Sequence, residues 1–149
     1  LGDVYFKKLF PMGVDAMIEG LELVKAGVII KHNQRLEDGS YESWFGKAAA
    51  KIDWSKPVAD IYNIIRAANP APGAWTTIGG SELKIYDSAR VDGTGTAGQV
   101  VSVNEDGVTV QAEGGRILIK RVRPADGGKT AASEWAAAAG INSGTKLGS

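Results

Sequence analysis

The spacing of the hydrophobic residues changes at a proline-rich corner, and this change constrains the fold of the chain more than any other feature of the sequence. Apolar residues recur every three or four positions from Val58 to Ala68, which is the spacing of one face of a helix. From Trp75 onward, apolar and polar residues alternate, which is the spacing of a strand. The sequence therefore predicts a helix that ends at Asn69-Pro70, followed by a β-rich region.

The corner itself has a defined chemistry. Pro70 and Pro72 lack backbone donors and bias the residues before them toward extended geometry, and Gly73 tolerates any φ that the corner needs. We expect Trp75 to pack at the end of the sheet beneath the helix. We interpret Pro70, Pro72, Gly73 and Trp75 as a structural corner without a ligand contact.

Five short strands are predicted after the corner. They are Trp75–Ile78, Leu83–Ala89, Gln99–Val103, Val108–Ala112 and Arg116–Val122, with Gly79-Gly80 as the first turn. In the first hairpin, Leu83 and Ile85 should face one side and Lys84 and Tyr86 the other. So small a sheet hides its edges best by closing, which predicts an α+β fold with a small OB-like antiparallel β-barrel.

Helices are expected to flank this barrel. Ser55 is the predicted N-cap of the helix before the corner, with Pro57 in its first turn, and Thr130 is the predicted cap of a short helix over 130–139. Near the N-terminus, the spacing of Val14 to Val24 predicts a helix over 13–26 that stops at Gly27. A second apolar stretch before it is expected to end at Pro11.

Composition excludes several classes of function. The 149 residues contain no cysteine and one histidine, His32, which excludes disulfides, thiolate metal sites and a multi-histidine cage within the chain. We expect no metal. No apolar run is long enough for a membrane span, and the start of the chain does not resemble a signal peptide, so we expect a cytoplasmic protein without a membrane partner.

The sequence offers no set of catalytic residues. The glycine-rich segment 93–98 lies between predicted strands and lacks the Lys-Ser/Thr and the helix of a phosphate loop. His32 lies on a polar arm, where a solvated loop histidine is the simplest interpretation. Glu105 and Asp106 fall in a predicted turn, where acidic residues commonly bond the backbone.

One strand carries a cluster of cations: Arg116, Lys120, Arg121 and Arg123. Together with Lys84 and Arg90 they could contact phosphates from one face of the barrel. Residues 51–149 hold 11 basic and 10 acidic residues, however, and nucleic-acid-binding domains usually carry a clear excess of positive charge. The charge balance favours a solvated strand and leaves phosphate binding as the alternative.

Several motifs resemble a known family. The runs Ala50–Ser55 and Asn69–Thr76 are similar to the C-terminal domain of the 10-formyltetrahydrofolate-dependent formyltransferases. Leu83–Tyr86, Gly98–Val100 and Arg123–Ala125 fall where that family has barrel strands and a closing loop. Leu1–Tyr5 and Phe10–Val14 look like the last helical segment of its α/β catalytic domain.

The resemblance implies that a parent enzyme transfers one-carbon units from 10-formyltetrahydrofolate. The family's catalytic Asn, His and Asp lie upstream of the segment that Leu1 begins, so the resemblance assigns no catalytic and no cofactor-binding residue here. His32 has no matching motif around it. The fragment is therefore expected to hold no cofactor, to be inactive alone and to pack against its own N-terminal catalytic domain.

The resemblance leaves the formyl acceptor open between water, tRNA and a sugar amine. Phe10–Gly13, Ser40–Ser43, Gly73–Thr76 and the weak basicity favour the dehydrogenase-type hydrolase. Arg66–Pro70 and Arg123–Ala125 favour the alternative, a domain of methionyl-tRNA formyltransferase that contacts initiator tRNA.

The expected organisation has four parts. Residues 1–30 are a helical remnant of the catalytic domain, 31–50 a linker, 51–139 the barrel domain and 140–149 a tail. A third interpretation is an interaction domain whose apolar N-terminal helices associate with a second copy.

Overall fold

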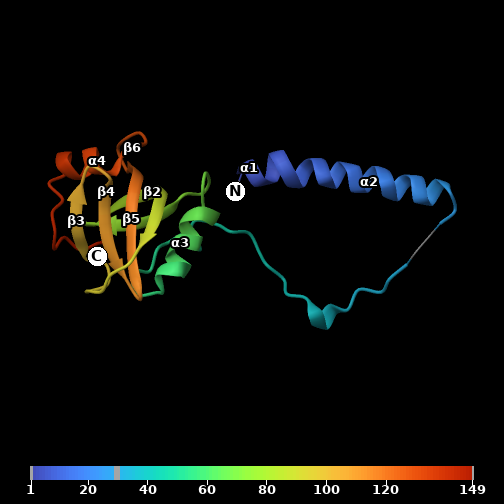
Figure 1. Cartoon of the computed structure of the whole chain (residues 1–149), viewed down its shortest axis with the longest axis horizontal. Helices are drawn as coiled ribbons and strands as arrows, with labels where there is room; N and C mark the ends of the chain where they lie inside the picture. The colour runs from blue at the N-terminus through green and yellow to red at the C-terminus, as the bar shows by residue number, and fades with distance from the viewer. Residues whose placement is uncertain (1, 29–30, 149) are drawn as a thin grey trace. The chain divides into compact units, whose positions relative to one another are not determined.

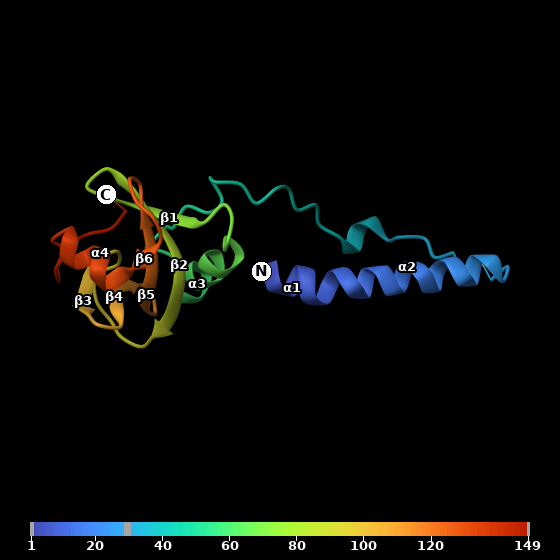
Figure 2. The ribbon, with the colours of Figure 1, turned by 90° about the horizontal axis from the view of Figure 1, so that it is seen from above.

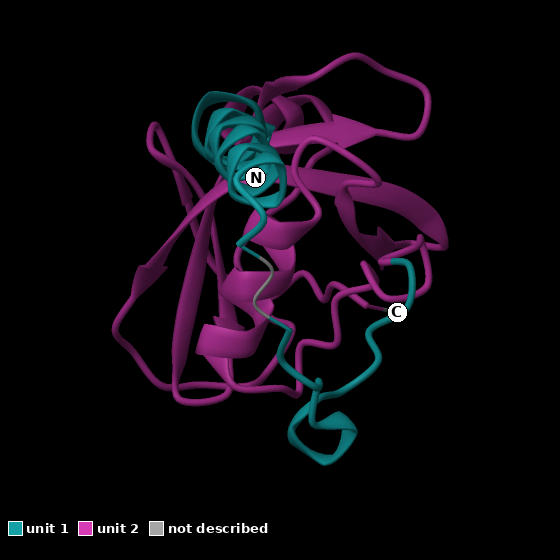
Figure 3. Ribbon diagram, turned by 90° about the vertical axis from the view of Figure 1, so that its right-hand side faces the viewer, with its two compact units in different colours: residues 1–44 teal, residues 45–149 magenta. Residues whose placement is uncertain are grey.

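The computed structural model describes residues 2–28 and 31–148. The predicted boundaries at residues 1, 30 and 149 fall on or beside residues that lie outside this range. The chain divides into two compact units, Leu1–Trp44 and Phe45–Ser149 (Figure 3).

Unit 1 contains one helical run. It consists of α1 (Gly2–Val4), a π-helical segment η1 (Tyr5–Leu9) and α2 (Phe10–Lys25). The expectation that the apolar stretch ends at Pro11 is wrong, because the helix continues through it. Pro11 is the second residue of α2. Phe10 before it donates to Tyr5 O in the π-helical pattern, so the missing N–H of Pro11 falls where the two hydrogen-bond patterns meet.

The helix ends where the sequence predicts. Gly27 has φ 74° and donates to Val24 O, while Val28 donates to Leu23 O, the pattern of a glycine-terminated helix. The apolar side chains of α2 are exposed in this unit; Met17, for example, is 66% exposed. A single 3-10 turn, η2 (Leu36–Asp38), interrupts the polar segment that follows.

Unit 2 is built on an antiparallel sheet. Its strands are β1 (Ala74–Ile78), β2 (Ser81–Val91), β3 (Val100–Asn104), β4 (Gly107–Ala112), β5 (Gly115–Pro124) and β6 (Thr130–Ala131). The spatial order is β1-β2-β5-β4-β3, and the two-residue β6 pairs with β5 (Figure 1). The predicted fold class, an α+β domain with a small barrel-like antiparallel sheet and flanking helices, is confirmed.

The edge strands β1 and β3 do not pair with each other. Instead, Thr145 O accepts from Val100 N at 2.8 Å, and Gly148 N donates to Thr77 O at 2.8 Å. The C-terminal segment 144–148 therefore bonds to both edges and connects them. Leu147 is 2% exposed and belongs to the core.

Two helices pack on the sheet and share one core with it. They are α3 (Val58–Ala67), which contacts β2 and β5, and α4 (Ala132–Ala138), which contacts β4 and β5 (Figures 1 and 2). The largest buried side chains include Ile61, Ile65, Leu83, Ile85, Ile117 and Ile119.

Both predicted helix caps are wrong. Ser55 lies in a turn in which its N–H and hydroxyl donate to Asp53 Oδ1, and Pro57 occupies the N-cap of α3. Thr130 belongs to β6, where it pairs with Val122, and its hydroxyl donates to Glu134 Oε2 at 2.7 Å. In both cases the side-chain oxygen bonds a nearby group other than the helical N–H groups that a cap would satisfy.

Candidate nucleic-acid interface

The structure places the proline-rich corner between α3 and β1. Gly73 has φ 83° and donates its N–H to Ala68 O at 2.9 Å, which turns the chain back from the helix end. A Cβ atom at Gly73 would lie 3.0 Å from Tyr86 Oη and 3.2 Å from Lys84 Cδ. The corner therefore lies directly against two side chains of β2.

Polar contacts fasten the corner to β2. Asn69 Nδ2 donates to Tyr86 O at 2.8 Å, and Lys84 Nζ donates to Pro72 O at 3.0 Å. Tyr86, which was expected on the same side of the strand as Lys84, is only 7% exposed. It stands at an irregularity in the pairing of β2 with β5, between Ile85 and Asp87, and it is covered by the corner.

Trp75 does not take the buried position that we expected. Alternation along β1 turns Ala74 and Thr76 into the core and leaves Trp75 half-buried on the other face. The indole that is buried near the corner is that of Trp54, which is 5% exposed and donates from Nε1 to Thr76 Oγ1 at 2.9 Å. The alternating pattern of Ala74, Trp75 and Thr76 is the signal that could have indicated this.

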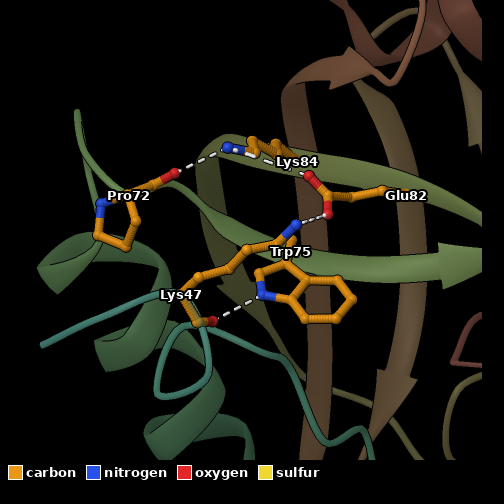
Figure 4. Close-up of polar contacts among 5 residues, drawn as sticks. All are labelled: Lys47, Pro72, Trp75, Glu82 and Lys84. Atoms are coloured by element: carbon orange, nitrogen blue, oxygen red, sulfur yellow. Dashed lines mark hydrogen bonds and ion pairs between the residues drawn. The ribbon is translucent and has the colours of Figure 1, made fainter.

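A small network holds Trp75 in place (Figure 4). Its Nε1 donates to the backbone carbonyl of Lys47 at 2.8 Å, and Lys47 Nζ pairs with Glu82 at 2.5 Å. Glu82 also lies 4.0 Å from Lys84 Nζ. The segment before Ala50, the corner and the β1–β2 hairpin are thus joined by one set of polar contacts.

Cations lie over the two aromatic rings of this region. Lys47 Nζ and Lys51 Nζ are 5.2 and 5.4 Å from the centroid of the Trp75 ring. Lys129 Nζ is 3.8 Å from the centroid of the Tyr86 ring. These distances are those of cation–π interactions.

The four predicted phosphate contacts on β5 do not form one group. Arg116 anchors the glycine-rich loop, because its Nη2 donates to Thr94 O at 3.1 Å and its Nε to Gln111 Oε1 at 3.0 Å. Lys120 and Arg121 are consecutive and both exposed, at a second irregularity in the strand pairing. Arg123 is exposed near the end of β5.

Each of these positions has different neighbours. Lys120 and Arg121 line a polar hollow of about 420 Å³ together with Asp87 and Glu134. Arg123 is directly opposite Lys84 on β2, which is in turn opposite Trp75 on β1.

Arg90, which was expected to join the β5 cations, lies elsewhere. Its guanidinium is 5.5 Å from the centroid of the Tyr62 ring, and Arg66 lies 5.4 Å from the same ring. The pairing irregularities that separate these cations leave no mark in the sequence pattern.

The other residues that the sequence analysis considered lie in solvent or in turns. His32 is exposed in unit 1, and the N–H of Asp106 donates to Asn104 Oδ1 within the β3–β4 turn. Hydrogen bonds from the Ser55 hydroxyl and N–H hold the pKa of Asp53 below its ordinary value.

Within residues 2–28 and 31–148, no group of His, Cys, Asp and Glu side chains could hold a metal ion. No helix in the same ranges is long and apolar enough to cross a membrane.

Comparisons with a family profile and with individual proteins point to the same family. The profile described as "Formyl transferase, C-terminal domain" matches residues 45–140. The methionyl-tRNA formyltransferase of Chromobacterium violaceum is 35% identical over 141 residues, which are 95% of this chain and 45% of that protein. The protein of the same name from Geotalea daltonii is 30% identical over 95% of this chain and 45% of its own length. This chain thus spans less than half the length of these relatives.

Solved structures add a likeness of fold. A crystal structure of a HypX variant from Aquifex aeolicus superimposes with a TM-score of 0.63 and 18% identity. The match covers 84% of this chain and 23% of that protein.

Proposed function

Because this chain belongs to the formyl transferase C-terminal domain family, we propose that it is the C-terminal part of an enzyme that transfers a formyl group to an aminoacyl-tRNA. The observation that carries the proposal is the 35% identity, over 95% of the chain, to a methionyl-tRNA formyltransferase. In this proposal the chain itself contacts the tRNA, works in the cytoplasm and carries none of the groups that react.

The formyl donor in this proposal is 10-formyltetrahydrofolate, as a substrate bound by an upstream catalytic domain. Residues of the present chain would hold that domain and the acceptor in position. The exposed apolar side chains of α2 are consistent with a surface that an upstream domain covers, because exposed apolar patches of this kind usually mark interfaces.

A second candidate is a hydrolase that passes the formyl group to water. The balance of 11 basic against 10 acidic residues over 51–149 favours it, because RNA-binding domains usually have a larger excess of cations. In that case the barrel-like domain would have no RNA partner.

Binding of tRNA by the 149-residue chain tests the proposal. We expect fluorescence anisotropy to detect initiator tRNA at about 50 mM salt, with an affinity that falls linearly on a logarithmic salt scale. Absence of binding under these conditions would overturn the RNA role.

Product analysis with the full-length protein separates the two acceptors. Incubation with 10-formyltetrahydrofolate should give formylated methionyl-tRNA when the charged tRNA is present, and little formate without it. Rapid release of formate in the absence of tRNA would support the hydrolase instead.

A further inference from the structure

We infer that an unpaired segment of RNA binds on the surface formed by Lys47, Lys51, Trp75, Lys84 and Arg123, with one base stacked on Trp75. We call these five residues the corner face. The inference rests on the proposed RNA partner and identifies where on this chain the RNA lies and how it is held.

The Trp75 ring is already oriented for stacking. The hydrogen bond from Nε1 to Lys47 O fixes one edge of the indole, and the pairing of Trp75 with both Lys84 and Lys51 fixes its backbone. The ring is half-buried, so part of it stays accessible beside the two lysines. Aromatic side chains of this kind serve as stacking platforms for successive bases.

The cations around the ring are arranged for a phosphate backbone. Across three neighbouring strands, Trp75, Lys84 and Arg123 stand directly opposite one another, so their Cβ atoms follow one line about 5 Å apart. Lys51 continues this row on the other side of β1, where it pairs with Trp75, and its Nζ is 5.4 Å from the ring centroid. A chain that stacks on Trp75 therefore meets positive charge on both sides.

The electrostatic balance favours the corner face over the rest of β5. Among the described residues, Glu82 is the carboxylate that forms ion pairs with the corner face, and it is shared by Lys47 and Lys84. Lys51 and Arg123 make no ion pair within the part of the chain that the structure describes. In contrast, the hollow that Lys120 and Arg121 line with Lys129 also contains the carboxylates of Asp87 and Glu134, and Arg116 is engaged by the loop at 93–98.

The two lysines over Trp75 do not block the ring. Both are exposed, and cation–π contacts at exposed sites are weak. A stacked base can replace the ammonium groups, which then become available to the adjacent phosphates. Stacking and phosphate contact are thus coupled at this position.

The first experiment measures the affinity of the 149-residue chain for a labelled, unstructured 12-nucleotide RNA by fluorescence anisotropy. Lys51→Gln and Arg123→Gln should each weaken binding several-fold and reduce the salt slope by about one. The matched control, Lys120→Gln with Arg121→Gln, removes two exposed cations of the same sheet and should change the affinity less than twofold.

The second experiment observes the ring directly. The chain is labelled with 5-fluorotryptophan, and the ¹⁹F resonance of each indole is assigned by substitution. Trp75 should shift on addition of the RNA, whereas buried Trp54 should not. Trp75→Leu should weaken binding about tenfold, with thermal unfolding as the check that the domain remains folded.

The outcomes separate this inference from the proposed function. If tRNA binds but the oligonucleotide does not, the stacked unpaired segment is wrong and the RNA role stands. If the control pair weakens binding while Lys51→Gln and Arg123→Gln do not, the location is wrong. If neither RNA binds the wild-type chain, the RNA role fails together with the inference.

Discussion

At the scale of single residues, short-range polar contacts decide the local conformation. Asp53 Oδ1 accepts from the hydroxyl of Ser55 at 2.6 Å and from its N–H at 3.0 Å. These two bonds stabilise the charged carboxylate and lower the pKa of Asp53 from its ordinary value of 3.8, the hydroxyl having the larger effect. Asp53 thereby orders the turn that leads into α3.

This contact gives a prediction for pH dependence. Because the pKa is lowered in the folded state, its contribution to stability is present above pH 3.8 and is lost as the pH falls through the folded-state value. Ser55→Ala removes the hydroxyl bond, so the titration midpoint of Asp53 should rise toward 3.8. NMR titration of the Asp53 carboxyl carbon in both proteins measures this, and an unchanged midpoint would exclude the hydroxyl as the main cause.

The two tryptophans near the corner illustrate the limit of sequence reasoning at this scale. Alternation along β1 could have indicated that Trp75 faces away from the core, but nothing in the sequence marked Trp54 as buried, because its segment has no regular period. Only the pairing of residues 50–52 with β1 places Trp54 where it reaches Thr76.

At the scale of elements, close approach between strands limits which residues fit. Gly107 begins β4 with φ 138°, and a Cβ atom there would lie 2.0 Å from the carbonyl oxygen of Ile119 on β5. Since that neighbour is backbone, the contact cannot be relieved by a rotamer change. A glycine is therefore required for the β4–β5 pairing.

A pair of glycine substitutions separates the clash from backbone strain. Gly114→Ala, at φ 69° with open space around it, should cost about 1–2 kcal/mol of unfolding free energy through its positive φ alone. Gly107→Ala should cost more than about 3 kcal/mol, because the backbone clash adds to the strain. Urea denaturation of both variants measures the difference, and equal losses would refute the role of the close approach.

Regular elements were predictable and irregular pairing was not. The hairpins, the helix before the corner and the stop at Gly27 follow from hydrophobic period and turn residues, which act locally. The strand β6 has two residues and no period of its own, so Thr130 looked like a helix cap. The pairing irregularities at Tyr86 and Lys120 depend on contacts between strands distant in sequence, and they dispersed the predicted cation cluster.

At the scale of the whole second unit, the last residues complete the sheet. Leu147 N donates to Gly98 O at 2.8 Å, and its side chain is buried. No alternation of apolar and polar residues marks this glycine-punctuated segment, so the sequence suggested only a tail. Its role depends on the two edges that it joins, which are formed by other parts of the chain.

Loss of this contact should destabilise the domain as a whole. Leu147→Ala should lower the unfolding free energy by about 2–4 kcal/mol, because it removes a fully buried side chain. Ser143→Ala, at an exposed position directly before this segment, should change it by less than about 0.5 kcal/mol. Denaturant melting distinguishes them, and a Leu147→Ala loss as small as that of the control would show that the segment is dispensable.

The connection between the sheet edges also has a consequence for synthesis on the ribosome. Residues 144–148, which join β3 to β1, are translated after every strand of the sheet. Until this segment has emerged and paired, the backbone groups that it covers on both edge strands stay open to other chains. The domain should therefore be most prone to edge-to-edge association in the interval before residues 144–148 pair.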